Sequence, residues 1–195
     1  MNIYKLVEDA AKKWSTNFAI HEAHASLTFA DLFIQTETLR AKLTQLGVGK
    51  GMGIGVMARN SSNFIIALLA SVGCKAVVMP ISHQLKKAEL DEIIENTGLH
   101  AILDDLSGVS PLDSFQEIIS TPQGNLRFGW TGKNRETAIS PHVPDAAFIR
   151  FTSGTTGKSK GVIVSHHSTL QRIEAANKAL LLGPEDTVVW VLPMA

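Results

Sequence analysis

Residues 151–168 read FTSGTTGKSKGVIVSHHS, and this stretch says more about the fold than any other part of the chain. From Thr152 to Gly161 every residue is Gly, Ser, Thr or Lys, and apolar residues typical of strands lie on both sides. Glycine permits positive φ angles and close approach of the backbone, while amides, hydroxyls and ammonium groups donate hydrogen bonds to phosphate oxygens. A flexible Gly/Ser linker would explain the composition, but not the two lysines or the flanking strands. The stretch therefore predicts a phosphate-binding loop held between two strands.

Segments typical of strands and helices alternate before this loop. Strands are expected at 54–57, 76–81 and 101–103, with helices ending near Gly73 and Thr97 between them. This β-α-β-α-β order predicts an α/β fold, a mainly parallel sheet layered with flanking helices. Other expected elements are a helix opened by a Thr28/Asp31 capping box and ended by Gly47, buried strands at 146–151 and 162–164, a helix from Ser165 to about Leu182, and a final strand at 187–192.

The segment 104–145 has weaker patterns and many turn residues. It predicts an internal linker, with a short helix at 115–119 and an exposed connection at 131–145. The last eight residues, VVWVLPMA, are almost entirely apolar, and an exposed apolar strand favours aggregation. We therefore interpret residues 1–195 as an N-terminal fragment of a larger domain, and we expect the isolated fragment to self-associate.

The amino-acid composition argues against several classes of function. Basic and acidic residues balance, 18 against 18, so no global field would draw the chain to nucleic acid or an anionic membrane. The longest apolar run, 64–74, is too short to cross a bilayer, and the N-terminus lacks a signal-peptide pattern. The one cysteine, Cys74, lies in an apolar stretch and is expected to be a buried small hydrophobe. These features predict a soluble, cytoplasmic protein.

The loop could belong to a P-loop ATPase or kinase, whose pattern is G-x-x-x-x-G-K-[ST]. Gly157, Lys158 and Ser159 match, but Thr152 stands where the first glycine should be. A P-loop also leads directly into a helix, whereas Gly161 is followed by the β-branched run VIVS. These differences disfavour that class.

The full string FTSGTTGKSKGVIVSHHS resembles the phosphate loop of the adenylate-forming superfamily, which comprises acyl-CoA synthetases, nonribosomal peptide synthetase adenylation domains and luciferases. The resemblance extends to SLTFADL at 26–32, LLASVGCKAVVMPIS at 68–82 and VLPMA at 191–195. Two differences are visible: Ser159 stands where the superfamily usually has proline, and GKGMGIG replaces its usual Gly-Asp-Arg turn.

This resemblance implies that a carboxylic acid and ATP form an acyl-adenylate and pyrophosphate, before the acyl group passes to a thiol, either coenzyme A or a carrier protein. It implies ATP and Mg²⁺, the latter held mainly by residues beyond this chain, and use of coenzyme A is an expectation of the same kind. It assigns Lys160 as the functional cation. The predicted phosphate-binding residues are Thr152, Ser153, Gly154, Thr155, Thr156, Gly157, Lys158 and Lys160. The superfamily's adenine, ribose and magnesium segments and its C-terminal domain are absent here, so the fragment alone is expected to be inactive.

The remaining candidates have simpler interpretations. HEAH at 21–24 is one residue short of the zinc-protease pattern H-E-x-x-H, and no metal site is predicted. His166 and His167 are adjacent and are expected to be surface or capping residues, with a structural role for His166. Trp190 is expected in the core. A truncated, noncatalytic module that binds a nucleotide or a partner protein stays an alternative function.

Overall fold

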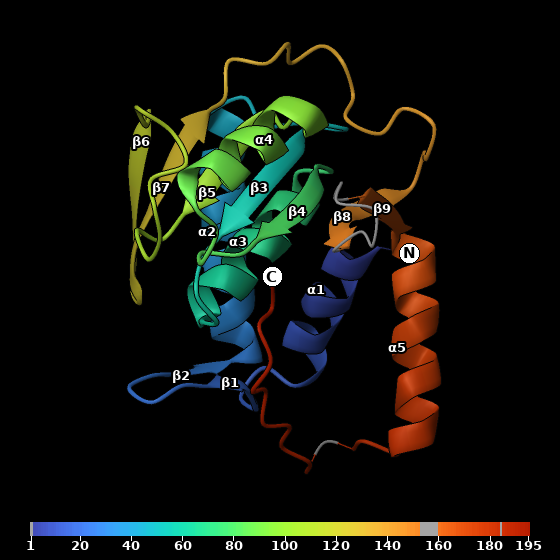
Figure 1. Ribbon diagram of the computed structural model, residues 1–195. Coiled ribbons are helices and arrows are strands. Elements are labelled where there is room, and N and C mark those ends of the chain that lie inside the picture. Colours follow the sequence, from blue (N-terminus) through green and yellow to red (C-terminus); the bar gives the residue numbers. More distant parts are fainter. Residues whose placement is uncertain (1, 153–159, 184) are drawn as a thin grey trace.

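A computed structural model describes residues 2–152, 160–183 and 185–195. Its main sheet orders the strands as β6-β7-β5-β3-β4-β8-β9 (Figure 1). The four central strands, β5, β3, β4 and β8, run parallel, while β6, β7 and β9 add antiparallel pairings at the two edges. The strand bounds are β3 Gly53–Met57, β4 Val77–Ile81, β5 Ala101–Asp104, β6 Glu117–Thr121, β7 Gly124–Trp130, β8 Ala146–Thr152 and β9 Lys160–Ser165. The predicted α/β fold with a mainly parallel sheet is confirmed.

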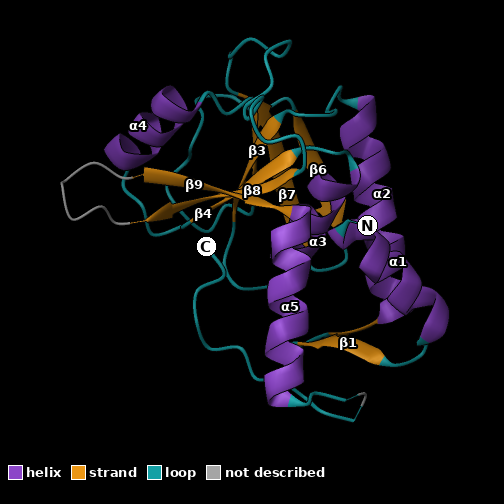
Figure 2. Ribbon diagram, turned by 90° about the vertical axis from the view of Figure 1, so that its right-hand side faces the viewer, coloured by secondary structure: helices purple, strands orange, loops and turns teal. Residues whose placement is uncertain are grey.

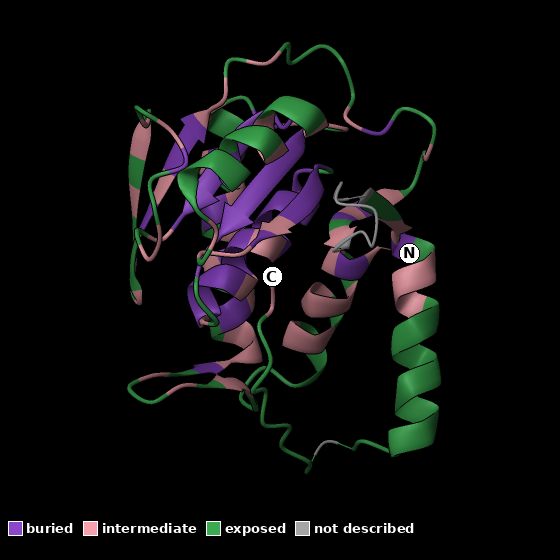
Figure 3. Ribbon diagram, viewed as in Figure 1, coloured by how far each residue is buried: buried purple, intermediate pink, exposed green. Residues whose placement is uncertain are grey.

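Helices cover both faces of this sheet. On one face lie α1 (Ile3–Lys13), α2 (Phe29–Gln45) and α3 (Ser62–Gly73), and α4 (Lys87–Thr97) covers the other (Figure 2). The apolar core is divided in the same way, because Phe64 and Ile66 of α3 belong to one cluster and Leu90 of α4 to another. The consequence is a three-layered arrangement with the buried strands in the middle (Figure 3).

The capping box that the sequence predicts at Thr28 and Asp31 is present. Thr28 Oγ1 accepts a hydrogen bond from the Asp31 amide at 3.1 Å, and Asp31 Oδ2 accepts one from the Thr28 amide at 3.0 Å. This reciprocal capping box opens α2, and Ser61 caps α3 in the simpler one-sided way. Gly98 ends α4 at a φ of 65°, a left-handed conformation that glycine adopts without steric cost.

The segment 104–145 differs from the expected linker. It contributes β6 and β7, an antiparallel hairpin that joins the main sheet beside β5. The expected helix at 115–119 is wrong, because Ile118 and Ile119 alternate between the two faces of β6. On β7, Leu126 and Phe128 are fully buried, which is the two-residue period of a strand. Residues 131–145 form the long connection that the sequence predicted, and residues 105–116 also lie outside helices and strands.

The end of the chain also differs from its prediction. After α5 (His166–Leu180), residues 187–192 form no strand, and the side chains of Val188 to Leu192 are exposed. Trp190 is 58% exposed, so its expected place in the core is wrong. A strand needs a neighbouring strand for its backbone hydrogen bonds, and none pairs with this segment within the described part of the chain.

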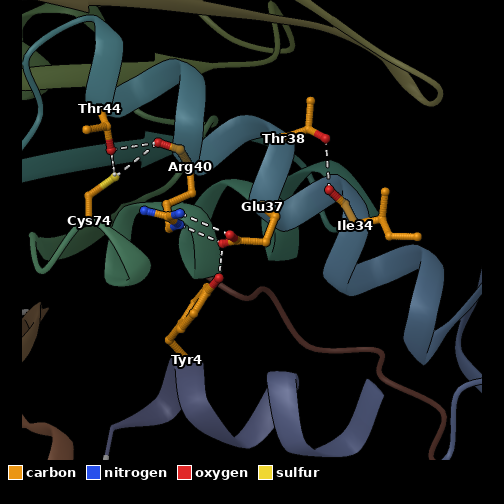
Figure 4. A network of polar contacts seen from close by, with 7 residues as sticks. All are labelled: Tyr4, Ile34, Glu37, Thr38, Arg40, Thr44 and Cys74. Carbon is orange, nitrogen blue, oxygen red and sulfur yellow. Dashed lines mark hydrogen bonds and ion pairs between the residues drawn. The ribbon is translucent and has the colours of Figure 1, made fainter. Parts of the chain in front are cut away.

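A polar network joins the three helices on one face (Figure 4). The Tyr4 hydroxyl of α1 donates a hydrogen bond to the Glu37 carboxylate of α2. Glu37 Oε1 also accepts a hydrogen bond from Arg40 Nε at 2.6 Å. Cys74, just after α3, contacts Thr44 Oγ1 at 3.6 Å and the Arg40 carbonyl at 3.5 Å through its sulfur. Cys74 is a buried free thiol, as predicted. No helix in the described ranges has both the length and the apolar character to span a membrane.

The remaining elements lie near the ends of the chain. The hairpin of β1 (Phe18–His21) and β2 (Ser26–Thr28) forms a separate two-stranded sheet. Helix α5 stands away from the layers along most of its length (Figure 1), and its residues are exposed from Gln171 onward. Only the start of α5 packs against the fold, where it meets β8, β9 and α1.

Candidate phosphate-binding hairpin

The predicted loop joins two paired strands. β8 and β9 are antiparallel, and Phe151 pairs with Gly161 and Thr152 with Lys160 at the end of the ladder. The paired backbones of Thr152 and Lys160 therefore fix both ends of the connecting segment. The sequence predicts Lys160 within the loop, whereas in the structure it is the first residue of β9.

The hairpin lies at the edge of the sheet where the parallel strands end. β8 runs parallel to β4, with Val78 opposite Phe148, so Thr152 lies at the carboxyl edge formed by β5, β3 and β4. In α/β sheets ligands bind outside this edge, at the point where successive helices change face. Here α3 and α4 follow adjacent strands and cover opposite faces, which locates that point between β3 and β4. The hairpin lies one strand away from it.

The described residues include only part of the predicted site. The backbones of Thr152 and Lys160 are described, and they face each other across the ladder. The other predicted phosphate-binding residues lie outside the described ranges, and their roles stay predictions: Ser153, Gly154, Thr155, Thr156, Gly157 and Lys158.

The element that follows the loop separates the two classes of phosphate loop. A P-loop leads into a helix whose N-terminus faces the phosphates. Here the chain enters β9, and α5 begins only at His166. The strand predicted after Gly161 is confirmed, and this geometry disfavours the ATPase or kinase alternative.

His166 has a structural position at the start of α5. Its ring is buried, and Nδ1 accepts a hydrogen bond from the Ile3 amide at 3.4 Å, which joins α5 to α1. Asp145 accepts from the His166 amide through its carbonyl and from the His167 amide through Oδ2. Burial lowers the pKa of His166, and the nearby negative charge of Asp145 raises it by less. The ring is therefore neutral near pH 7. The predicted structural role is confirmed, although His166 is buried and only His167 is on the surface.

The other histidine pattern forms no metal site. His21 and His24 are both exposed in the β1–β2 hairpin, and His21 Nδ1 lies 2.9 Å from Ser26 Oγ. Within the described ranges, no three His, Cys, Asp or Glu side chains gather as metal ligands would.

The sequence alone missed two polar residues at the carboxyl edge. Asn60 follows β3, and its side chain binds the backbone of Leu192 and Met194. Asp104 ends β5, is fully buried and pairs with Arg127. In the sequence Asn60 is part of a turn before a helix. Its partners lie far away in the chain, so no local pattern indicates the contact. In the sequence Asp104 begins the segment expected to be a linker, because the short strand β7 has no strong local pattern.

The residues of the hairpin fit a triphosphate chemically. Their side chains supply hydroxyls and ammonium groups, which are donors to phosphate oxygens. Mg²⁺ prefers carboxylate and water oxygens, which this donor set does not contain. The hairpin thus suits the phosphates themselves more than the metal that accompanies them.

The fold is an α/β sheet, and its β8–β9 hairpin holds the predicted phosphate loop between two paired strands. The family of AMP-binding enzymes matches residues 7–195, and the chain belongs to this family. Among its relatives, Zwittermicin A synthase ZmaJ from Bacillus cereus is 26% identical over 194 residues, which cover 98% of this chain and 36% of that protein. Syringomycin synthase SyrB1 from Pseudomonas syringae pv. syringae is 25% identical over 193 residues, or 96% of this chain and 30% of that protein. The chain therefore spans about a third of the length of these relatives.

Solved structures agree on the fold. o-Succinylbenzoate CoA synthetase (MenE) from Bacillus subtilis, in complex with the acyl-adenylate intermediate OSB-AMP, matches with a TM-score of 0.79 at 18% identity, over 100% of this chain and 50% of that one. The N-terminal domain of FACL13 from Mycobacterium tuberculosis matches with a TM-score of 0.65 at 24% identity, over 85% of this chain and 44% of that one.

Proposed function

We propose that the protein containing this chain activates a carboxylic acid with ATP and then transfers the acyl group to a thiol. The observation that supports this most directly is the β8–β9 hairpin, which carries a donor-rich loop at the carboxyl edge of a parallel sheet. Membership of the AMP-binding family supports this reaction class. The chain is then the N-terminal portion of a larger catalytic domain, with residues outside it completing the site.

The proposed chemistry has two steps. A carboxylate oxygen attacks the α-phosphorus of ATP, the bond to the bridging oxygen of the β-phosphate breaks, and pyrophosphate leaves. Donors around the β- and γ-phosphates stabilise the charge that accumulates on this leaving group, and Lys160 is the proposed cation among them. Mg²⁺ would neutralise part of the same charge. A thiol sulfur then attacks the acyl carbon, AMP leaves, and the thiol proton passes to solvent.

The proposed thiol acceptor is coenzyme A, as in an acyl-CoA synthetase, with a carrier protein as the alternative. The structural match to a CoA synthetase supports the first, and relatives such as Nonribosomal peptide synthetase 7 from Gibberella zeae support the second. The exchange assay below decides which class of acid is activated.

The test is carboxylate-dependent exchange of labelled pyrophosphate into ATP by the full-length protein, with fatty, aryl and amino acids. The 195-residue chain is the control, and we expect it to be inactive. Exchange that requires one acid class supports the proposal, and added coenzyme A or phosphopantetheinylated carrier protein then identifies the acceptor. Release of ADP and phosphate would instead indicate an ATPase, and nucleotide binding without exchange would indicate a noncatalytic module.

A further inference from the structure

The side chain of Asn60 binds the backbone of a distant segment at two points. Its Nδ2 donates to the Leu192 carbonyl at 2.7 Å, and its Oδ1 accepts from the Met194 amide at 2.9 Å. A carbonyl and the amide two residues later are the groups that a parallel neighbouring strand would satisfy. One side chain thus replaces a short piece of strand pairing.

This contact marks the place where the end of the chain returns to the fold. Val191 and Leu192 are exposed, 81% and 64%, whereas Met194 and Ala195 pack against the larger apolar cluster. Residues 185–190 pass near the β1 strand, with which they line one pocket, before the chain reaches the main sheet (Figure 1). Within the described residues, Asn60 provides both side-chain hydrogen bonds that hold residues 192–194.

The position of Asn60 connects this contact to the candidate site. Asn60 lies in the turn between β3 and α3, at the carboxyl edge where the helices change face. A ligand of such a sheet binds at that point, so the backbone from Leu192 onward is fixed beside the expected ligand crevice. The β8–β9 hairpin reaches the same edge from the other side of β4.

We propose that Asn60 is a positioning residue, which fixes the segment around Met194 at the ligand crevice so that this segment can contact the acid or the nucleotide. The effect on catalysis depends on the proposed function, whereas the contact between Asn60 and residues 192–194 does not depend on it. Asn60 acts through the backbone of its partners and touches no reacting atom.

The local structure allows the contact to be removed cleanly. Ser61, not Asn60, caps α3 by accepting the Phe64 amide at 3.2 Å, and Asn60 is exposed. Asn60→Leu removes both hydrogen bonds at similar volume. Asn60→Asp keeps an acceptor for the Met194 amide and loses the donor to the Leu192 carbonyl. Asn177→Leu, an exposed asparagine on α5, is the matched control.

The first measurement is hydrogen exchange of the peptide that contains Met194, in the full-length protein. We expect faster exchange in Asn60→Leu and near-normal protection in Asn60→Asp and Asn177→Leu. The second measurement is pyrophosphate exchange. Because a misplacement of about 1 Å can cost about 100-fold in rate, we expect kcat/KM to fall at least about tenfold in Asn60→Leu, less in Asn60→Asp, and not in the control.

Each outcome has a distinct meaning. Unchanged protection at Met194 in Asn60→Leu would show that the contact does not hold the segment, and would overturn the inference. Faster exchange with unchanged kinetics would overturn the positioning role alone. A wild-type protein without pyrophosphate exchange would overturn the proposed function and the catalytic role of Asn60 together, while the Met194 amide would still report whether the contact exists.

Discussion

Arg127 and Asp104 are joined by two parallel hydrogen bonds, from Nε to Oδ1 and from Nη2 to Oδ2, each 2.7 Å long. The Asp104 side chain is fully buried, and the guanidinium group of Arg127 also lies over the Phe115 ring, 4.1 Å from its centroid. The pair links β7 to the carboxyl end of β5, so the hairpin that extends the sheet is anchored by a charge pair as well as by its backbone.

Loss of Arg127 is expected to destabilise the fold strongly. Arg127→Ala leaves the Asp104 carboxylate buried without its partner, which costs about 3–5 kcal/mol in the free energy of unfolding. Urea unfolding measures this change. Lys133→Ala is the control, because Lys133 pairs with the exposed Glu95 and such surface pairs contribute about 1 kcal/mol or less. Equal effects of the two substitutions would show that the Asp104 pair has no special importance.

Cys74 is expected to be unreactive in the folded protein. Burial raises the pKa of its thiol, and only the thiolate reacts with alkylating reagents. Iodoacetamide at pH 8 should therefore modify the chain's one cysteine slowly, and quickly after unfolding in guanidinium, as mass spectrometry can follow. Rapid modification of the native chain would contradict the expected protection of Cys74.

The same shift affects stability. Because the thiol pKa is higher in the folded chain than in the unfolded chain, the neutral thiol contributes to the free energy of unfolding below its ordinary pKa. This contribution is lost as the pH rises through the folded pKa.

The buried ring of His166 should make the folded protein less stable in acid. Its folded pKa is lowered by burial, so below the ordinary histidine pKa of 6.5 the unfolded chain binds a proton that the folded chain does not. The free energy of unfolding should therefore decrease as the pH falls from about 7, until the folded pKa is passed. His166→Gln keeps an acceptor for the Ile3 amide and should weaken this dependence in urea titrations between about pH 5 and 7.5. The same substitution at exposed His167 should leave the dependence unchanged.

The local signals in the sequence predicted most of the fold. Thr28 with Asp31 and Gly98 determine helix ends within a few residues, and the apolar run of β3 is long enough to identify a central parallel strand. The β6–β7 hairpin was missed because short strands with turns between them lack a long periodic pattern. Residues 187–192 were assigned to a strand from composition, but a strand also requires a partner, which composition does not report.

The sequence predicted the part of the candidate site that depends on a local pattern. A loop of Gly, Ser, Thr and Lys between two strands is a local pattern, so its location after β8 followed from the sequence. The contact of Asn60 with Leu192 joins residues far apart in the chain, and nothing in either segment indicates it. Long-range pairings of this kind are decided by the fold, and only the structure revealed them.

The exposed apolar end of the chain predicts self-association of the 195-residue protein. Val189 and Val191 are 80% and 81% exposed and lie on either side of exposed Trp190, so association would remove apolar surface from water. Sedimentation velocity should show an average mass that increases with concentration. Trp190→Ser with Val191→Ser should reduce this increase, whereas Val109→Ser, at an exposed site in another loop, should not. A single monomeric species at high concentration would refute the expectation.

Lys160 is the residue whose loss should separate catalysis from folding. Its backbone pairs with Thr152 at the start of β9, where alanine can keep the same hydrogen bonds, so Lys160→Ala should unfold at the same temperature as the wild type. A lost donor to the departing pyrophosphate raises the barrier by about 2–4 kcal/mol, or about 30- to 1,000-fold in pyrophosphate exchange. Lys178→Ala, on exposed α5, controls for loss of a positive charge and should exchange at the wild-type rate. If Lys160→Ala also exchanges at that rate, or if it no longer folds, Lys160 is not the proposed cation.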